Sequence, residues 1–299
     1  MEISLLKKIR RNIRNYRRIL KSYIVSDEKY YKKKYKEKYG RELELDLNKI
    51  ETFNERLIYR ILNERKEIYT QLADKYLVRK YVKEKIGEKY LIELFGVYDN
   101  VDKINYDILP NEFVLKCNHN SGTVIICEDK KNLNINAVNE KLEGALAQNF
   151  YYVTREWHYK NIIPKIICEE KLKDITDYKF HCFGGKVEYI EAIYGRFTDK
   201  RFNVYDRNWK LQPFTIGRPN TDDIKEKPLN FDKMIEVAEK LSAEFDYCRV
   251  DLYNNNGEIK FGEITFTPAS GLDDLPIEYD KKLKRIWDKV LIEEKRWMK

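Results

Sequence analysis

The stretch CRVDLYNNNGEIKFGEITFTPASG, which runs from Cys248 to Gly271, decides the fold. Two runs of residues typical of strands flank an Asn-rich turn that ends at Gly257, and this pattern predicts a β-hairpin. A hairpin needs no charged side chains at its centre, but here each run carries two polar residues at alternate positions. They are Arg249, Asp251, Glu263 and Thr265. Because side chains alternate between faces along a strand, the two polar residues of each run share one face.

The length of the loop decides whether these four polar side chains lie on the same face of the hairpin. A two- or four-residue loop pairs Asp251 with Lys260 and places Glu263 on the opposite face. A three-residue loop pairs Asp251 with Phe261 and gathers all four on one face. Gly257 can adopt the positive φ of the bulge that commonly accompanies three-residue loops, so we predict this second register.

Two carboxylates on one face of a hairpin, here Asp251 and Glu263, repel each other unless a cation lies between them. Mg²⁺ is the natural candidate, because it takes hard oxygen ligands and typically binds one or two carboxylates together with the phosphates of a nucleotide. Arg249 on the same face would then contact phosphate or carboxylate oxygens. A surface hairpin with a salt bridge between Arg249 and one of the acids explains the same residues equally well.

Two further stretches place cations or acids at strand ends. In FVLKCNHNSGTVIIC, Lys116 ends a strand and a polar loop with Gly122 follows, so backbone N–H groups and the lysine can surround phosphates. A plain hairpin loop would have the same glycine, and these residues alone favour that interpretation. In PKIICEEKLKDITDYKFHCF, Glu169 and Glu170 end a strand and Lys179 begins the next. Acids at such an end can accept hydrogen bonds from adenine or ribose, although most are simply solvated.

Composition limits the classes of protein that remain. A chain of 299 residues is long enough for two domains or one large α/β unit. The absence of a run of eighteen apolar residues argues against a spanning helix, and a start that is basic throughout argues against a secretory signal, so we predict a cytoplasmic protein. The five cysteines lie in strand-like runs without CxxC spacing, which predicts reduced thiols in the core instead of a zinc site.

The net charge is +8, and the excess of cations is concentrated before residue 90. In KKIRRNIRNYRRILK and KYYKKKYKEKYGR, the residues Leu, Ile and Tyr recur at helical spacing among the cations. One interpretation is a basic amphipathic helix that rests on an anionic membrane face or a polyanionic partner. The other is a solvated helix whose apolar stripe packs on its own domain, and we favour it because charge runs are usually exposed faces.

The pattern along the chain changes from helical to strand-like after about residue 100. Apolar residues recur every three or four positions over residues 1–100, where Asp74–Gly87 is predicted as one helix that its final glycine closes. From Phe113 onward the sequence predicts consecutive, antiparallel strands. Their residues are FVLKC, TVIIC, IIPKIICEE, KFHCF, KVEYIEAIYG and RFNVY. A helix from Phe231 to about Phe245, the hairpin and a last helix from about Glu278 complete the prediction.

Six short motifs follow one another from about residue 50 to 275, and they are TFNERL, ADKYLVRKYV, LKCNHNSG, IICEEKL, DYKFHCFGGKV and the RVDLY…GEITFTPASG hairpin. In this order they resemble the TupA-like branch of the ATP-grasp superfamily, which occurs among bacterial capsule and cell-surface polysaccharide biosynthesis proteins. The resemblance implies an α+β ATP-grasp fold, in which two α+β lobes with antiparallel sheets hold the nucleotide, preceded by a helical N-terminal region. We expect residues 1–100 to form the helical leader and N-terminal region, 101–172 the small lobe, and 173–299 the C-terminal lobe with the metal site.

The resemblance also implies roles by position. Arg249 would act on the transferring phosphoryl group or the acyl phosphate, and Lys179 would be a further phosphate contact. Asp251, Glu263 and Thr265 would bind Mg²⁺, with Thr265 standing where many ATP-grasp enzymes have asparagine. The residues implied to bind ATP are Lys75, Lys116, Asn118, Ser121, Gly122, Glu169, Glu170 and Asp177. In this set the lysines would approach the phosphates, the acids would lie near adenine and ribose, and the loop from Asn118 to Gly122 would close over the site.

The usual reaction of the superfamily is activation of a carboxylate as an acyl phosphate, followed by attack of an amine. The resemblance therefore implies an ATP- and Mg²⁺-dependent ligase that joins an amine, such as an amino acid, to a carboxylate, such as a uronic acid, in a surface polysaccharide or its precursor. The basic leader would suit an anionic glycan or a peripheral contact with the inner membrane face, and no nucleic-acid partner is expected. The alternatives are a kinase of a sugar or lipid-linked acceptor, a glycosyltransferase that uses a nucleotide sugar, and a basic binding module without catalysis.

Overall fold

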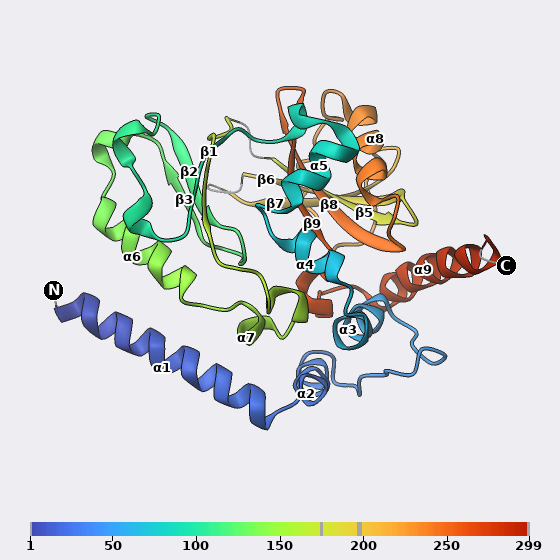
Figure 1. Cartoon of the computed structure of the whole chain (residues 1–299). Helices are drawn as coiled ribbons and strands as arrows, with labels where there is room; N and C mark the ends of the chain where they lie inside the picture. Colours follow the sequence, from blue (N-terminus) through green and yellow to red (C-terminus); the bar gives the residue numbers. More distant parts are fainter. Residues whose placement is uncertain (1, 174–175, 196–198, 298–299) are drawn as a thin grey trace. The chain divides into compact units, whose positions relative to one another are not determined.

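The computed structural model describes residues 2–173, 176–195 and 199–297 (Figure 1). The chain forms two compact units. Unit 1 consists of Met1–Arg41, Arg65–Leu77 and Ile92–Lys171, and unit 2 consists of Glu42–Glu64, Val78–Leu91 and Leu172–Lys299. Residues 1–100 therefore contribute to both units, and the expected domains 1–100, 101–172 and 173–299 stay a prediction.

Unit 1 contains an antiparallel sheet with the strand order β1-β4-β2-β3. The strands are β1 (Leu94–Tyr98), β2 (Phe113–Cys117), β3 (Val124–Cys127) and β4 (Ile166–Glu169). Buried and half-buried side chains alternate along β2, so Phe113 and Leu115 enter the core while Lys116 points to the other face. Helix α6 (Ile135–Leu146) packs on β2 and contributes Val138 and Leu142 to the same core. Lys116 therefore lies on the face of the sheet opposite to the one that α6 covers.

The helices of unit 1 other than α6 are α1 (Glu2–Ile24), α2 (Asp27–Tyr39), α4 (Glu67–Ala73) and α7 (Tyr151–Thr154). The Ser26 side chain begins α2 by accepting a hydrogen bond from the N–H of Lys29, and Gly40 ends it at a φ of 69°. Tyr31 is fully buried, and its hydroxyl donates to the Thr154 carbonyl oxygen (2.7 Å). Helix α2 therefore packs on its own unit through tyrosines, as we favoured for a basic helix of this kind.

The same interpretation is wrong for α1. Its apolar stripe is exposed, with Leu6, Ile13 and Leu20 at 55%, 47% and 60% of their full accessibility. The side that faces the rest of unit 1 is mostly polar, and there the Asn15 side-chain amide donates to the Ala147 carbonyl oxygen (3.3 Å), while Ile19 is a half-buried apolar residue. No helix in the described ranges, α1 included, combines the length and apolar character needed to cross a membrane.

Unit 2 contains an antiparallel sheet with the strand order β7-β6-β5-β8-β9. The strands are β5 (Asp177–Phe183), β6 (Lys186–Tyr194), β7 (Arg201–Asp206), β8 (Tyr247–Asn255) and β9 (Glu258–Thr265). Helix α8 (Phe231–Ser242) packs on β5, β6 and β8. Helices α3 (Phe53–Asn63) and α9 (Ile277–Trp297) share a second core with the sheet. Its aromatic members include Phe53, Phe183, Tyr247 and Trp287.

The short elements of the chain connect these helices and strands. They are α5 (Val78–Ile86) and the 3-10 turns η1 (Glu88–Tyr90), η2 (Val101–Lys103), η3 (Tyr106–Ile108), η4 (Lys130–Asn132), η5 (Trp157–Tyr159) and η6 (Pro268–Gly271). Inside η6 the non-glycine residues Ala269 and Ser270 have φ of 48° and 57°. Such left-handed backbone is costly for residues with a side chain, and it persists where surrounding structure holds it. This turn follows directly after β9.

The α+β class, the antiparallel sheets and the strands predicted from Phe113 onward are confirmed. The five cysteines are buried free thiols, each within a strand. The helix predicted over Asp74–Gly87 begins only at Val78, because the Asp74 carboxylate accepts the N–H groups of the next turn. Strand β1 was not predicted; its residues LFGVY form a short apolar run, and periodicity alone does not assign a run of this length to a strand or a helix.

The predicted hairpin is present, but its predicted register is wrong. The loop has two residues, Asn256 and Gly257, both with positive φ (54° and 92°), as expected of a tight hairpin turn. Asp251 pairs with Glu263 instead of Phe261. The cause is a β-bulge in which Gly262 is the extra residue of β9, between the pair formed by Leu252 and Phe261 and the pair formed by Asp251 and Glu263. The bulge, and not the loop, brings the four polar side chains to one face.

Gly262 permits the bulge because it has no side chain. A Cβ added there would lie 3.0 Å from the Asp251 carbonyl oxygen and 3.2 Å from Cε2 of Tyr253. We expect Gly262→Ala to lower the free energy of unfolding by about 1–3 kcal/mol, because the backbone next to Asp251 must move. Glu258→Ala, at an exposed position of the same strand, should change it by less than about 0.5 kcal/mol. Chemical denaturation measures both values, and equal values for the two variants would contradict the tight packing at the bulge.

Candidate functional site

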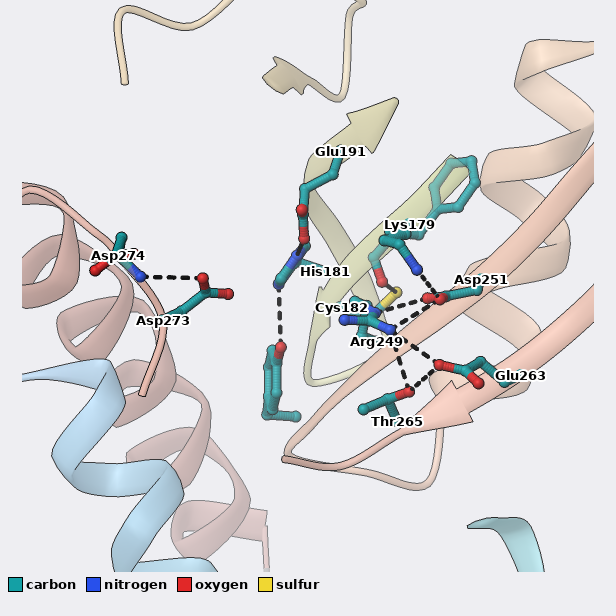
Figure 2. Close-up of polar contacts among 12 residues, drawn as sticks. Lys179, His181, Cys182, Glu191, Arg249, Asp251, Glu263, Thr265, Asp273 and Asp274 are labelled. Carbon is teal, nitrogen blue, oxygen red and sulfur yellow. Dashed lines mark hydrogen bonds and ion pairs between the residues drawn. The ribbon is translucent and has the colours of Figure 1, made fainter. Parts of the chain in front are cut away.

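Two rows of polar side chains cross three neighbouring strands of unit 2 (Figure 2). The first row consists of Lys179 on β5, Asp251 on β8 and Glu263 on β9. The second row, two residues along each strand, consists of His181, Arg249 and Thr265. Because the register aligns the strands and side chains alternate, all six project from one face of the sheet. The intervening residues, such as Phe180 and Val250, are fully buried on the other face.

Arg249 is the centre of this cluster. Its Nε donates to Asp251 Oδ1 (2.7 Å), and its Nη2 donates to Asp251 Oδ2 (2.8 Å) and Glu263 Oε1 (3.0 Å). The Thr265 hydroxyl donates to the same oxygen of Glu263 (2.9 Å). Burial by itself would lower the pKa of Arg249, but Asp251 and Glu263 raise it well above its ordinary value, so the guanidinium stays charged. One planar cation therefore joins the carboxylates of two strands.

Lys179 supplies a second cation to the cluster and forms an ion pair with Asp251. Burial and the Arg249 charge act to lower the pKa of Lys179, but Asp251, Asp177 and Glu263 outweigh them and leave it above its ordinary value. Asp251 is only 3% exposed, whereas the Glu263 side chain is 38% exposed. The cluster thus combines two cations with two anions, and Glu263 is its accessible member.

His181 and Glu191 form a second polar group beside the cluster, and sequence reasoning missed it. His181 Nε2 is 2.6 Å from Glu191 Oε1 on β6, and Nδ1 is 3.0 Å from the Tyr247 hydroxyl. Burial by itself would raise the pKa of Glu191, but the hydrogen bond and charge of His181 lower it below the ordinary value. The signal in the sequence was the spacing, because His181 stands two residues after Lys179 and so shares its face.

The TFNERL motif holds the segment that follows β9. Thr52 and Glu55 form a reciprocal capping box at the start of α3. The Asn54 side chain accepts the N–H of Asp273 (3.1 Å) and donates to the Asp273 carbonyl oxygen (3.3 Å). Burial and the nearby charge of Glu191 raise the pKa of the Asp273 carboxyl above its ordinary value. Helix α3 therefore fixes the segment that carries Asp273, a residue whose carboxyl group is influenced by the charges of Glu191 and His181.

The donor set of Asp251, Glu263 and Thr265 suits Mg²⁺, because all three offer hard oxygen atoms on adjacent strands. In the described part of the chain, no group of three or more His, Cys, Asp and Glu side chains could hold a metal ion. Mg²⁺ bound to one or two carboxylates usually takes its remaining ligands from water and from the phosphates of a nucleotide. Arg249 already occupies oxygens of both acids, so a metal ion and the guanidinium would compete for the same atoms.

In unit 1 the candidates Lys75 and Asn118 fix the loop after β2. Lys75 Nζ donates to the Asn120 carbonyl oxygen (2.7 Å) and its N–H to the Asn118 carbonyl oxygen (3.1 Å). Asn118 is fully buried, and its side-chain amide donates to Asp74 Oδ2 (2.9 Å) and the Ile163 carbonyl oxygen (3.0 Å). The Asn118 side chain is thus a structural anchor of the loop base.

The tip of this loop contains Ser121 and Gly122, which are both exposed, with Gly122 at a φ of 86°. Two more candidates of unit 1 meet directly, because Lys116 Nζ lies 2.5 Å from Glu169 Oε2 on the neighbouring strand. Glu170 is half-buried, and its N–H donates to the Glu93 carbonyl oxygen (3.0 Å).

The last nucleotide candidate, Asp177, belongs to unit 2. It is buried at the start of β5, two residues before Lys179, whose pKa it helps to raise.

A family model described as TupA-like ATPgrasp matches residues 55–286 of this chain. The chain belongs to the TupA-like ATP-grasp family. The matched range contains all the candidate residues from Lys75 to Thr265, and the expected ATP-grasp fold is confirmed. A search of the curated proteins found no match.

Three solved structures illustrate what this chain is similar to. The D-alanine--D-alanine ligase from Bacillus anthracis is 17% identical, with 75% of this chain and 67% of that chain covered and a TM-score of 0.45. The ATP-grasp ligase PsnB complexed with minimal precursor, Mg and ADP is 11% identical, with coverages of 67% and 52% and a TM-score of 0.37. N5-carboxyaminoimidazole synthetase from Staphylococcus aureus is 12% identical, with coverages of 66% and 45% and a TM-score of 0.37.

Proposed function

We propose that this chain is an ATP- and Mg²⁺-dependent ligase that joins an amine to a carboxylate through an acyl phosphate. The observation that carries the proposal is the cluster of Lys179, Arg249, Asp251 and Glu263 on one face of the unit 2 sheet. Largely buried ion pairs contribute little net stability compared with apolar side chains of similar size. A role in binding and moving a phosphoryl group explains their presence better than a role in folding.

Each side chain of the cluster has a distinct part in the proposal. Asp251 and Glu263, assisted by Thr265, would hold Mg²⁺, which when bound offsets the charge of the β- and γ-phosphate oxygens. Arg249 would leave the carboxylates and contact the transferring phosphoryl group, because its fork of N–H donors matches phosphate oxygens. Lys179 would remain beside Asp251 and supply positive charge where negative charge develops.

The residues of the nucleotide set would bind the rest of ATP. Lys75 and Lys116 would approach the phosphates, and Glu169, Glu170 and Asp177 would accept hydrogen bonds from adenine and ribose. The base of the loop at Asn118 is fixed, whereas Ser121 and Gly122 are exposed at its tip. This contrast supports a loop whose tip offers backbone N–H groups to phosphate and excludes water from the acyl phosphate.

The proposed reaction has two steps. A carboxylate oxygen of the first substrate attacks the γ-phosphorus of ATP, and the bond from this phosphorus to the oxygen of ADP breaks. The amine nitrogen of the second substrate then attacks the acyl carbon, phosphate leaves, and the nitrogen releases a proton to solvent. The family resemblance supports a uronic acid of a surface polysaccharide as the carboxylate and an amino acid as the amine. A cytoplasmic location, where ATP is available, belongs to the same proposal.

Calorimetric binding of a non-hydrolysable ATP analogue, with and without Mg²⁺, tests the nucleotide site. We expect Mg²⁺-dependent binding by the wild type and its loss in Asp251→Asn/Glu263→Gln. Glu263→Gln alone is the safer variant for folding, since Glu263 is the accessible acid of the cluster. The matched control is Asp232→Asn/Glu258→Gln, which makes the same chemical changes at exposed positions of unit 2 and should bind like the wild type.

The products then separate a ligase from a kinase. A ligase releases ADP and phosphate and forms a new amide, whereas a kinase releases ADP and forms a stable phosphoester. Absence of ATP-analogue binding in the wild type would overturn both readings and turn attention to nucleotide sugars.

A further inference from the structure

Helix α1 carries an apolar stripe on its exposed side. The stripe consists of Leu6, Ile9, Ile13, Tyr16, Leu20 and Tyr23, which are between 45% and 81% exposed. Their spacing alternates between three and four residues, so they form one line along the helix. A helix of a globular protein normally turns such a stripe toward its own core. Here the stripe is presented to the outside.

The opposite side of α1 is the one that packs on the rest of unit 1. Arg11, Asn15 and Ser22 are half-buried and follow one another at four- and seven-residue intervals. The Asn15 amide donates to the Ala147 carbonyl oxygen, and Arg11 lies so close to Gly144 that a Cβ added there would be 2.5 Å from Nη1. Polar contacts therefore orient α1, and this orientation forces its apolar stripe outward.

A row of cations runs beside the apolar stripe. Arg10, Arg14, Arg17 and Lys21 are exposed, and their spacing of four, three and four residues places them on one side of the helix. Between Ile3 and Ile24 the sequence has eight Lys and Arg residues and no Asp or Glu. The exposed part of α1 is thus apolar along one line and uniformly positive along the next.

We propose that α1 binds an anionic membrane surface and lies in its plane. The apolar stripe would enter the boundary between head groups and acyl chains, and the row of cations would contact anionic head groups. Tyr16 and Tyr23 suit this boundary, because a tyrosine ring has an apolar body and a polar tip. The proposal needs no catalytic activity and stands apart from the ligase proposal.

The charge of α1 favours a membrane surface over two other partners, which are a second copy of the chain and a nucleic acid. The α1 helix of a second copy could cover an apolar line with this spacing, but it would bring eight further cations beside the first eight, with no Asp or Glu between Ile3 and Ile24 to pair with them. A nucleic acid would satisfy the cations, but it would leave the apolar stripe in water. An anionic lipid surface accommodates both features at once.

Co-sedimentation of the full chain with vesicles tests the proposal. We expect binding to vesicles of phosphatidylcholine with phosphatidylglycerol that is at least about 10-fold tighter than binding to phosphatidylcholine alone, because each cation near an anionic surface adds to the attraction. Ile9→Ser/Ile13→Ser/Leu20→Ser should weaken the binding by about 10-fold or more. Arg10→Gln/Arg14→Gln/Arg17→Gln should weaken it similarly and reduce its dependence on salt.

Matched controls use exposed residues elsewhere. Ile108→Ser/Ile163→Ser/Ile224→Ser removes three exposed apolar side chains, and Lys80→Gln/Lys233→Gln/Lys240→Gln removes three exposed cations. Both should bind vesicles like the wild type, and far-UV circular dichroism should report unchanged folding for every variant. Vesicle binding that survives loss of the apolar stripe would overturn the proposal. So would concentration-dependent dimerisation that the stripe variant abolishes, or binding to RNA or DNA that this variant retains while vesicles remain unbound.

Discussion

Arg60→Ala is expected to lower the free energy of unfolding by about 3–5 kcal/mol, because it removes one partner from a buried charge network. Arg60 is 1% exposed on α3. Its Nη1 donates to the Tyr247 carbonyl oxygen (2.8 Å) and the Phe266 carbonyl oxygen (3.3 Å), and its Nη2 donates to Asp246 Oδ1 (2.6 Å). Trp287 stacks on the guanidinium at 4.4 Å and donates its Nε1–H to the other oxygen of Asp246 (2.8 Å).

The position of these contacts explains the size of the effect. The two carbonyl groups belong to the start of β8 and to the residue after β9, so Arg60 clamps the two strands that carry Arg249 and Glu263. Its removal leaves the Asp246 carboxylate, whose side chain is 10% exposed, and two carbonyl oxygens of buried residues without this donor.

Urea denaturation compares Arg60→Ala with Arg65→Ala, which removes an exposed guanidinium five residues later and should cost less than about 0.5 kcal/mol. Arg60→Lys should be intermediate, because an ammonium group keeps the charge but lacks the planar fork. Similar stabilities of Arg60→Ala and Arg65→Ala would refute the clamp.

The sequence allowed most strands to be predicted, because their patterns depend on local alternation and on apolar runs. Phe113–Cys117 alternates between buried and half-buried side chains, and Ile166–Glu169 is buried throughout, so both stand out. Leu94–Tyr98 is also a short apolar run, but Gly96 stands in its middle and it follows a region of helical spacing, so its sequence alone does not assign it to a strand. Its strand structure comes from a partner about seventy residues away in the sequence, which no local pattern can reveal.

The candidate cluster was predicted through an incorrect register. The alternation of Arg249 with Asp251 was readable, but the face of Glu263 depends on the bulge at Gly262, and a bulge follows from how two strands pair. The partner of His181 was not readable either, because Glu191 is ten residues away on the next strand. The helical spacing of α1 could be recognised in the sequence. Which side of α1 faces the rest of unit 1 could not, because it depends on contacts such as that of Asn15 with Ala147.

Arg249→Met is expected to have opposite effects on metal binding and on catalysis. Among Lys179, Arg249, Asp251 and Glu263 the formal charges cancel, and removal of the guanidinium leaves an excess of one negative charge. Without nucleotide, the variant should therefore bind Mg²⁺ about 10-fold or more tightly than the wild type, because an opposing cation a few ångströms from the carboxylates is gone. If the chain is the proposed ligase, the variant's rate of ATP-dependent turnover should fall by about 10²- to 10³-fold, since a donor to the developing charge is lost.

Calorimetry with Mg²⁺ alone and thermal unfolding with and without Mg²⁺ give readouts that do not need the substrates. Asp251 and Glu263 lose a partner in Arg249→Met, so Mg²⁺ should raise the unfolding temperature of this variant more than that of the wild type. Lys260→Met removes a cation of β9 that pairs with Glu258 and should leave both readouts unchanged. Weaker Mg²⁺ binding by Arg249→Met would mean that the guanidinium organises the carboxylates for the metal. Tighter Mg²⁺ binding together with lost turnover would mean that Arg249 blocks the metal site until phosphate binds the guanidinium. One side chain cannot neutralise the carboxylates and the transferring phosphoryl group at the same time.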